Sequence, residues 1–518
     1  MKSYYNQLIK NFPCILIMLF PLGMVVGPLI GEIIMGLLII LFLSSILRNK
    51  DYELFKINFV KLFLIFYLLI SINTIVSFVE TEQVYKAIAH LRFIIFALAI
   101  CYFLKQNSKF IKFIFYFTSI TLLIVSIDGI YQYIKGENIF GYSRYRVDRI
   151  SGVFNDDLIL GSFISKFLPA ILSFYFYVFK KESILNIFYL LFILIVTIFT
   201  IFISGERSSM LFILIFCFLL LIFINIKLNY KFISILTFIG LIFITLFNNP
   251  VLLNRYYNQT IDHIFGQDVY NKQIIPEYYP LFKTSLKMFN DSLFFGQGFR
   301  SFRYKCDNDD FITFGDKYNI INNQVLTFDV SWKILNVQVI NLFVSDNDII
   351  KKGDEIFEYK ILKGNNQGKT LIFRSNKIGK IGKLSINEGS SFGSGHGIST
   401  LDISDLNITK ITKARKIGCD THPHNYYFQL LAETGIIGLF ILISIFVFFS
   451  IELIKILSKK FILKKTVKNQ SEIVLMIFFI SYFWPISFTG NFFNNWLSMT
   501  LFYSIGIYFF YNKYDKKN

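Results

Sequence analysis

The chain has few of the residues that build metal centres or disulfide frameworks. It contains five cysteines and five histidines in 518 residues, and no Cys-x-x-Cys pair or Cys/His group has the spacing of metal ligands. No glycine-rich loop of the nucleotide-binding type occurs either. We therefore expect no metal site and no nucleotide or other cofactor.

Acidic residues are also scarce, because 34 Asp and Glu stand against 52 Lys and Arg, a net charge of +18 at pH 7. A basic chain can bind nucleic acid, but no basic stripe falls on a soluble domain here, so we expect no nucleic-acid partner. Hydrophobic residues make up 54% of the chain, and the mean hydropathy is +0.54. Several apolar runs reach the roughly 20 residues that a membrane-spanning helix needs. The composition therefore predicts an all-α polytopic membrane protein.

The apolar runs predict about twelve transmembrane helices. The first run continues into more apolar sequence and lacks a small-residue cleavage site, so we interpret it as a span and not as a cleaved signal. The predicted spans are residues 12–27, 29–47, 57–79, 84–104, 110–134, 158–179, 184–203, 210–226, 232–247, 426–450, 473–488 and 496–511.

The charges between these spans predict an orientation. One set of loops is basic, whereas the opposite set includes residues 79–83 and 488–496, which carry no Lys or Arg, and the loop at 135–157 is the exception. Because Lys and Arg mark cytoplasmic loops, we expect a multi-pass protein of the cytoplasmic (inner) membrane with both termini in the cytoplasm. This orientation puts residues 249–425, and the active face, on the periplasmic side.

The periplasmic region contains a segment of different composition. Residues 320–405 replace Phe- and Leu-rich runs with alternating β-branched residues, Gly, Asn and Asp, which predicts a small β-rich soluble insert. We accordingly divide the chain into transmembrane residues 1–248, a first loop part 249–319, the insert 320–405, a return segment 406–425 and transmembrane residues 426–518.

The insert contains an internal repeat with a shift of 42 residues. It relates Val344, Ile350, Gly353 and Ile356 to Ile386, Phe392, Gly395 and Ile398. Two copies of one strand–turn–strand unit predict a two-fold sandwich, and the pattern resembles biotinyl/lipoyl-type domains and barrel-sandwich hybrids. The hairpin between the halves lacks the pattern that flanks a modified lysine in those domains. The insert is therefore either a docking module for an envelope protein partner or a tolerated insertion in a surface loop.

Two cysteines, Cys306 and Cys419, bracket the insert. An oxidising compartment permits a disulfide between them, which would contribute on the order of 4–5 kcal/mol in the chain-entropy model. We favour this bridge over two free thiols. It would tie the base of the insert beside the return segment.

Polar residues gather at the ends of spans that this topology puts on one side of the membrane. Arginine has a planar fork that grips phosphate oxygens, and histidine can remove a proton near neutral pH. We predict catalytic roles for His424 and Arg207, and substrate-binding roles for Arg149, Asn155, Arg300, Arg303, His422 and Asn425.

Structural roles compete with these assignments. Arg207 opens a span within SGERSSML, where an ionisable group is costly unless it works or is paired, so an ion pair with Glu206 or an anchoring role is the alternative. Arginines in loops are often merely solvated. Within the apolar spans, we expect Asp128 to neutralise Arg92 in a structural ion pair.

The return segment and the span after it resemble the signature of the O-antigen ligase and polymerase superfamily, membrane enzymes that act on undecaprenyl-diphosphate-linked glycans. That signature is His, then Asn, Ser or Gln, nine residues and Gly-x-x-Gly, matched here by His424, Asn425, Gly435 and Gly438. About twelve spans, a large outer loop before the histidine and a Gly-x-Gly turn at residues 296–298 are similar too. The resemblance covers most of the chain except residues 320–405.

The resemblance implies a metal-independent glycosyl transfer in which His424 acts on the acceptor hydroxyl and Arg207 binds the lipid diphosphate. Many members of the superfamily carry a further arginine upstream of the Gly-x-Gly turn, where this chain has Tyr278. Arg149, Arg300 or Arg303 would then have to substitute for it.

We therefore predict an O-antigen ligase-type glycosyltransferase that moves a glycan from undecaprenyl diphosphate to an outer-leaflet lipid or glycan acceptor such as lipid A-core. The alternatives are a polymerase of the same superfamily, whose acceptor is another lipid-linked repeat unit, and a protein-glycosylating transferase. A lipid-glycan flippase or transporter belongs to a different class. It would carry its polar residues near the bilayer midplane in paired inverted halves, whereas here they cluster at span ends.

Overall fold

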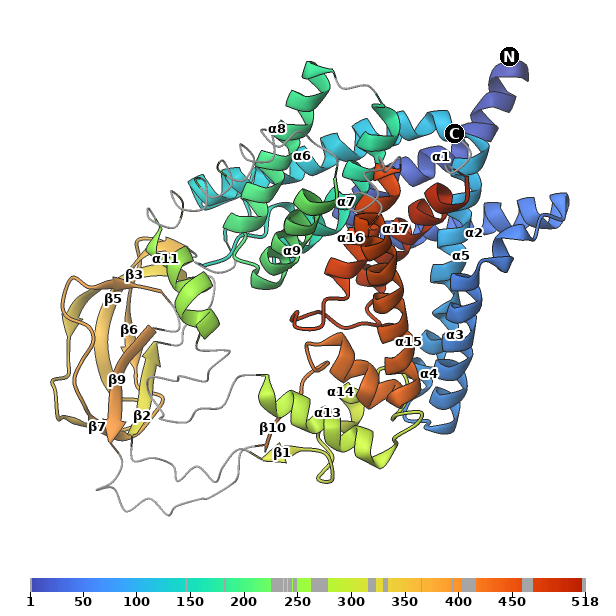
Figure 1. Cartoon of the computed structure of the whole chain (residues 1–518). Coiled ribbons are helices and arrows are strands. Elements are labelled where there is room, and N and C mark those ends of the chain that lie inside the picture. The colour runs from blue at the N-terminus through green and yellow to red at the C-terminus, as the bar shows by residue number, and fades with distance from the viewer. Residues whose placement is uncertain are drawn as a thin grey trace.

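The computed structural model of the chain (Figure 1) describes residues 2–144, 148–180, 183–224, 249–261, 278–314, 323–328, 334–364, 366–393, 396–402, 416–458 and 469–514, together with 236, 240 and 245. Helices form most of it, and a group of strands lies to one side of them. Apolar runs become helices because a helix pairs its own backbone donors and acceptors where water is absent. The predicted helical membrane protein with a small β-rich part is confirmed.

Within the described residues, seven helical segments are long and apolar enough to cross a membrane. They are α2 (Pro28–Asn49), α3 (Asn58–Val76), α4 with α5 (Thr81–Ala89 and Leu91–Gln106), η2 with α6 (Ser108–Phe110 and Ile111–Lys135), α7 (Leu160–Val178), α8 (Ile184–Ile203) and α15 (Tyr426–Leu457). Shorter apolar helices are Asn11–Val26 within α1 (Lys2–Val26), α9 (Arg207–Phe223) and α16 (Gln470–Tyr482). The predicted span at 232–247 lies almost wholly outside the described residues, so the total of twelve stays a prediction.

Short elements connect these helices and build the region around the site. They are η1 (Glu53–Lys56), η3 (Gly152–Phe154), α11 (Pro250–Leu253), the π-helical turn η4 (Asn254–Asn258), α13 (Tyr279–Asp291) and α14 (Phe302–Lys305). The last long helix, α17 (Asn495–Tyr514), occupies the predicted twelfth span.

Helices that are distant in the sequence pack into one core. α17 lies against α5 and α7, and α16 lies against α7 and α9. Gly506 permits the approach of α17 to α5, because a Cβ there would stand 2.7 Å from the backbone oxygen of Ala97. The rings of Phe20, Phe167 and Tyr503 then join α1, α7 and α17. Close packing of this kind holds helices together in lipid, where the hydrophobic effect between them is absent.

The predicted ion pair between Arg92 and Asp128 is wrong. Arg92 lies 3.4 Å from the carboxylate of Glu32 on α2. Asp128 instead accepts a hydrogen bond of 2.9 Å from the backbone N–H of Ile139, in the loop that follows its own helix. Arg92 and Asp128 therefore each have a partner other than the one that the positions of the spans suggested.

The insert is built from two four-stranded antiparallel sheets around one apolar core. The strand order is β2-β9-β7-β4 in one sheet and β6-β5-β3-β8 in the other. The strands are β2 (Asn323–Phe328), β3 (Ile334–Leu342), β4 (Ile349–Ile350), β5 (Glu355–Gly364), β6 (Thr370–Arg374), β7 (Gly379–Ile381), β8 (Ser391–Phe392) and β9 (His396–Asp402).

The two sheets agree with the internal repeat. A shift of 42 residues relates β3, β4 and β5 to β7, β8 and β9, and exchanging these strands turns the order β9-β7-β4 of one sheet into the order β5-β3-β8 of the other. The repeated positions Val344, Ile350, Ile356, Ile386 and Ile398 are buried in the shared core. The repeat is thus a packing pattern, while the likeness to biotinyl/lipoyl-type domains and the domain boundaries given above stay predictions.

A strand pair and a disulfide hold the two ends of the insert together. β1 (Thr313–Phe314) pairs antiparallel with β10 (Lys416–Ile417), and the two flank the insert in the sequence. Just outside this ladder, Cys306 and Cys419 form a disulfide with their Cα atoms 5.1 Å apart. The predicted disulfide is confirmed, and it puts the chain that leaves the insert directly beside the histidine motif.

Candidate active site

The histidine motif forms the N-terminal cap of α15. The side chain of Asn425 accepts hydrogen bonds from the backbone N–H groups of Tyr427 and Phe428, at 2.9 and 3.3 Å, as an N-cap residue does. Its amide also donates to the backbone oxygens of Pro485 and Ser487. The Asn425 side chain is therefore engaged at the start of the helix through both its oxygen and its amide nitrogen, and its predicted role in substrate binding stays a prediction.

His424 lies just outside this cap and pairs with an acid. Its Nε2 is 3.0 Å from Oδ2 of Asp420, and its side chain is 29% exposed. The residue has a φ of +58°, uncommon for a side-chain-bearing residue, and its backbone oxygen accepts from the N–H of Thr489 at 2.8 Å. Burial acts against the charge of Asp420, but hydrogen bonds from His424 and Thr421 outweigh it and lower the pKa of this carboxyl. An ionised Asp420 orients the imidazole.

The ring of His422 lies beside that of His424, tilted against it, but His422 differs from His424 in its burial and in its pKa. The two ring centroids are 4.1 Å apart, and His422 is only 9% exposed. Burial, followed by the charge of His424, lowers the pKa of His422 to about 4. His422 is therefore neutral at neutral pH and keeps a second positive charge away from His424.

α15 is broken nine residues below its cap. Gly435 has a φ of +65° and a ψ of −163°, which are not helical, and the loop after α13 lies in the break. Ile436 donates to the backbone oxygen of Leu293, and Gln297 donates to that of Ala432, both at 2.9 Å. A Cβ on Gly435 would stand 2.4 Å from the carbonyl of Phe294. The absence of a side chain at Gly435 therefore admits a loop backbone into the break in α15.

Arg300 lies in the loop after α13, and Arg303 lies on α14, which follows that loop. The Nε atoms of both are buried without a hydrogen-bond partner among the described residues. Burial, with the neighbouring charge of Arg303, lowers the pKa of Arg300. The charge of Arg303 also acts on His422. Two neighbouring cations therefore carry unused donors, and Arg303 is the one whose charge reaches His422.

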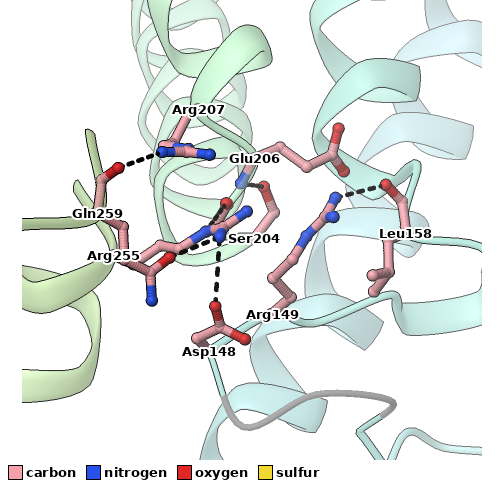
Figure 2. A network of polar contacts seen from close by, with 9 residues as sticks. Asp148, Arg149, Leu158, Ser204, Glu206, Arg207, Arg255 and Gln259 are labelled. Carbon is pink, nitrogen blue, oxygen red and sulfur yellow. Dashed lines mark hydrogen bonds and ion pairs between the residues drawn. The ribbon is translucent and has the colours of Figure 1, made fainter. Parts of the chain in front are cut away.

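A second group of polar residues is built around the starts of α7 and α9 (Figure 2). Arg207 donates to the backbone oxygen of Gln259 at 3.0 Å, and Arg149 donates to that of Leu158 at 2.8 Å. Arg255 donates to the backbone oxygen of Gly205 at 3.1 Å and lies 3.5 Å from the carboxylate of Asp148. These three arginines, the arginine group, therefore converge, and carbonyl oxygens are among the partners that hold them.

Glu206 sits among these arginines but serves a helix end. Its carboxylate accepts from the backbone N–H groups of Gly161 and Ser162 at 2.7 and 3.0 Å and from the hydroxyl of Ser209 at 3.0 Å. Figure 2 shows this carboxylate and the Arg207 guanidinium pointing to opposite sides. Burial raises the pKa of Glu206, opposed by the charge of Arg149 and these hydrogen bonds. The proposed structural pairing of Arg207 with Glu206 is thus replaced by a cap on α7.

The structure therefore brings the predicted residues together in two groups. His422, His424 and Asn425 lie together, with Arg303 acting on His422 and Arg300 beside Arg303, whereas Arg149 lies with Arg207 in Figure 2. Asn155 belongs to neither by contact: it is exposed at the end of η3 and makes no side-chain hydrogen bond to the described residues.

Sequence reasoning missed two residues of the site. Arg255 carried no signal beyond its place after the predicted ninth span, yet its guanidinium is buried at the centre of the arginine group. Asp420 stands four residues before His424, a spacing that could have suggested the pair. Tyr278, where many superfamily members carry arginine, has its ring 5.3 Å from that of His424 and 4.4 Å from that of Phe488. That position does face the site.

Taken together, the fold and the site define a multi-pass membrane protein that combines a His–Asp pair with clustered arginines at its helix ends. Residues 190–328 match the family model described as O-antigen ligase, which supports the O-antigen ligase superfamily for this chain. The matched range carries Arg207, Arg255 and the Gly-x-Gly turn, and the histidine motif follows it. No match was found among curated proteins. The family match supports an O-antigen ligase or polymerase type of function, and with it a lipid-linked glycan and the membrane as partners.

Proposed function

We propose that the chain is a ligase-type glycosyltransferase that moves a glycan from undecaprenyl diphosphate to a hydroxyl of an outer-leaflet acceptor such as lipid A-core. The observation that carries this proposal is the pair of His424 Nε2 and Asp420 Oδ2, 3.0 Å apart at the mouth of α15. A base oriented by an acid is what activation of a hydroxyl requires.

His424 acts as that base. Because its Nε2–H donates to the ionised Asp420, Nδ1 keeps the lone pair. The acceptor hydroxyl gives its proton to Nδ1 while its oxygen forms a bond to the anomeric carbon of the donor sugar. The bond from that carbon to the diphosphate oxygen breaks, and undecaprenyl diphosphate leaves with the electron pair. Asp420 stabilises the imidazolium that results.

The arginines receive the leaving diphosphate. Arg207 and Arg149 present guanidinium groups that donate to backbone carbonyl oxygens in Figure 2, and the planar fork of each can also bind phosphate oxygens. Arg255 holds the group in place through Asp148 and Gly205. Arg300 and Arg303 supply donors from the histidine side, and His422 and the exposed Asn155 line the path of the glycan.

The proposed setting is the cytoplasmic membrane, with both termini inside and the active face in the periplasm. Supporting this, the Cys306–Cys419 disulfide belongs to an oxidising compartment. The mechanism draws on no metal or other cofactor, because the donor is already activated by its lipid diphosphate.

The test is His424→Ala in a deletion strain, with the surface glycan resolved on a gel. We expect loss of the glycan, and the matched control His396→Ala, in the insert, should keep it. Unchanged glycan in His424→Ala would refute the catalytic role. Accumulated long lipid-linked chains would identify a ligase, whereas acceptors capped with single repeats would identify a polymerase.

Two further variants separate the roles of the groups. Asp420→Asn removes the charge that orients His424, so we expect a lower rate of transfer with little change in donor binding. Arg207→Lys keeps the charge but loses the planar fork, so we expect weaker donor binding. Wild-type activity in Arg207→Lys would reduce Arg207 to a membrane anchor.

A further inference from the structure

Lys166 is a half-buried cation on α7, between helices of the core. It lies six residues after the start of α7, about 9 Å along the helix axis. Its Nζ stands 3.9 Å from the ring centroid of Phe212 on α9 and 4.3 Å from that of Tyr482 on α16. The three helices pack against one another. Among the described residues, Lys166 has no hydrogen bond and no ion pair.

The two aromatic rings replace only part of the interactions with water that the Lys166 ammonium loses in this position. Ring faces attract the charge, but they do not replace hydrogen-bond acceptors, and the ammonium has three N–H donors. The carboxylate whose charge acts on Lys166 is that of Glu206, which already accepts from Gly161, Ser162 and Ser209. A cation in a membrane helix without an acceptor is costly and marks a functional site. The donors of Lys166 are therefore available to an anion from outside the chain.

The position of Lys166 joins the two halves of the site. On one side, Ser162 lies one turn before it on α7 and contacts Ser209, at 3.2 Å, within the Glu206 network at the arginine group. On the other side, the hydroxyl of Tyr482 is hydrogen-bonded to that of Tyr426 at 3.2 Å. Tyr426 is the first residue of α15, directly after the cap.

We propose that Lys166 binds phosphate oxygens of the lipid-linked donor, between the arginine group and the histidine end of α15. This inference rests on the proposed function, since it names a further binding residue for the same donor. The ligand chemistry is a phosphate anion, and the place of Lys166, within a helix that can cross the membrane, favours a phosphate that arrives on a lipid over one free in solution.

The test is direct binding of undecaprenyl diphosphate to the purified full chain in nanodiscs, with undecaprenol and inorganic pyrophosphate as comparison ligands. The variants are Lys166→Met, Lys166→Arg and the matched control Lys112→Met, which changes an exposed lysine at the start of α6. We expect Lys166→Met to weaken undecaprenyl diphosphate binding about 10- to 100-fold, the range of a lost charge-assisted hydrogen bond. Lys166→Arg and Lys112→Met should stay within a few-fold of the wild type.

Thermal unfolding separates binding from a structural role. If Lys166 serves a ligand, Lys166→Met unfolds at the wild-type temperature or above it, because a half-buried charge without a hydrogen bond to the described residues is replaced by an apolar chain of similar length. Wild-type binding in Lys166→Met, or a loss of binding that is accompanied by a lower unfolding temperature, overturns the inference. Equal binding of inorganic pyrophosphate overturns the assignment to a lipid. A wild-type chain that binds undecaprenyl diphosphate no better than undecaprenol overturns the proposed function itself.

Discussion

Replacing Gly435 with Ala should destabilise the protein and disable the site together. Gly435 has a φ of +65° and a ψ of −163°, a region essentially restricted to glycine. The added Cβ would stand 2.4 Å from both the carbonyl carbon and the oxygen of Phe294. These are backbone atoms, so the overlap cannot be relieved by turning a side chain.

The expected cost follows from these contacts. A side-chain-bearing residue in such a conformation costs about 1–3 kcal/mol. Relieving the overlap moves the loop away from α15 and breaks the hydrogen bond from Ile436 to Leu293, now 2.9 Å, with about 1–2 kcal/mol for a buried group left unpaired. Together these predict a loss of about 2–5 kcal/mol in the free energy of unfolding.

The assay is unfolding of the purified protein in detergent, followed by circular dichroism as denaturant is added. Gly36→Ala is the matched control, since Gly36 lies in α2 with nothing within 4 Å of an added Cβ; this change should be neutral or stabilising by up to about 1 kcal/mol. A Gly435→Ala variant within about 1 kcal/mol of the wild type would refute the reasoning that the loop backbone occupies the break.

Three further predictions follow from the same structure. His422 has a pKa of about 4 in the folded chain, below its ordinary value of about 6.5, so between these pH values the unfolded chain binds more protons than the folded chain. The free energy of unfolding should therefore fall by up to about 3 kcal/mol as the pH drops through that window. Thermal unfolding over a pH series should show this slope, and His422→Gln should lack it. The double variant in which Cys306 and Cys419 are both changed to Ser should lose at most about 4–5 kcal/mol of unfolding free energy. The control Cys217→Ala should change the unfolding free energy little, and equal stability of the double variant and this control would contradict a loop closed by the disulfide. Replacing residues 322–404 with a short Gly-Ser linker should retain glycan transfer on a gel, because β1 and β10 pair at the base of the insert; loss of transfer in a well-expressed variant would favour the docking role instead.

Much of the fold followed from local patterns in the sequence. The helices come from runs of apolar residues whose backbone must be paired internally. The insert can be recognised because Ile356 and Ile398 occupy equivalent core positions in two repeated units, and burial at such positions is a local property. The Cys306–Cys419 bridge followed from the compartment and from the position of the two residues at either end of one insertion.

The contacts of the site could not be derived in this way. Arg255 is placed by a carbonyl oxygen of Gly205 and a carboxylate of Asp148, far from it in the sequence, and no periodicity encodes that meeting. Glu206 is adjacent to Arg207 in the sequence, which favoured an ion pair, yet the open N–H groups at the start of α7 take its oxygens. Such competition between partners is decided only when the helices are packed.

The nine residues between the motif's Asn and its first Gly acquire a physical meaning from the break at Gly435. They form the outer part of α15, Tyr426 to Thr434, and polar contacts hold this part at several points along its length. Gln429 donates to Asn491 at 3.0 Å, and the carboxylate of Glu433 accepts from the backbone N–H of Phe302 at 3.1 Å. Because each residue of a helix turns the chain by about 100° and advances it by about 1.5 Å, one residue more or fewer would rotate His424 away from its present direction relative to the loop in the break. The nine-residue spacing in the signature therefore sets the distance and the rotation between His424 and the loop that carries Arg300 and leads to Arg303 on α14.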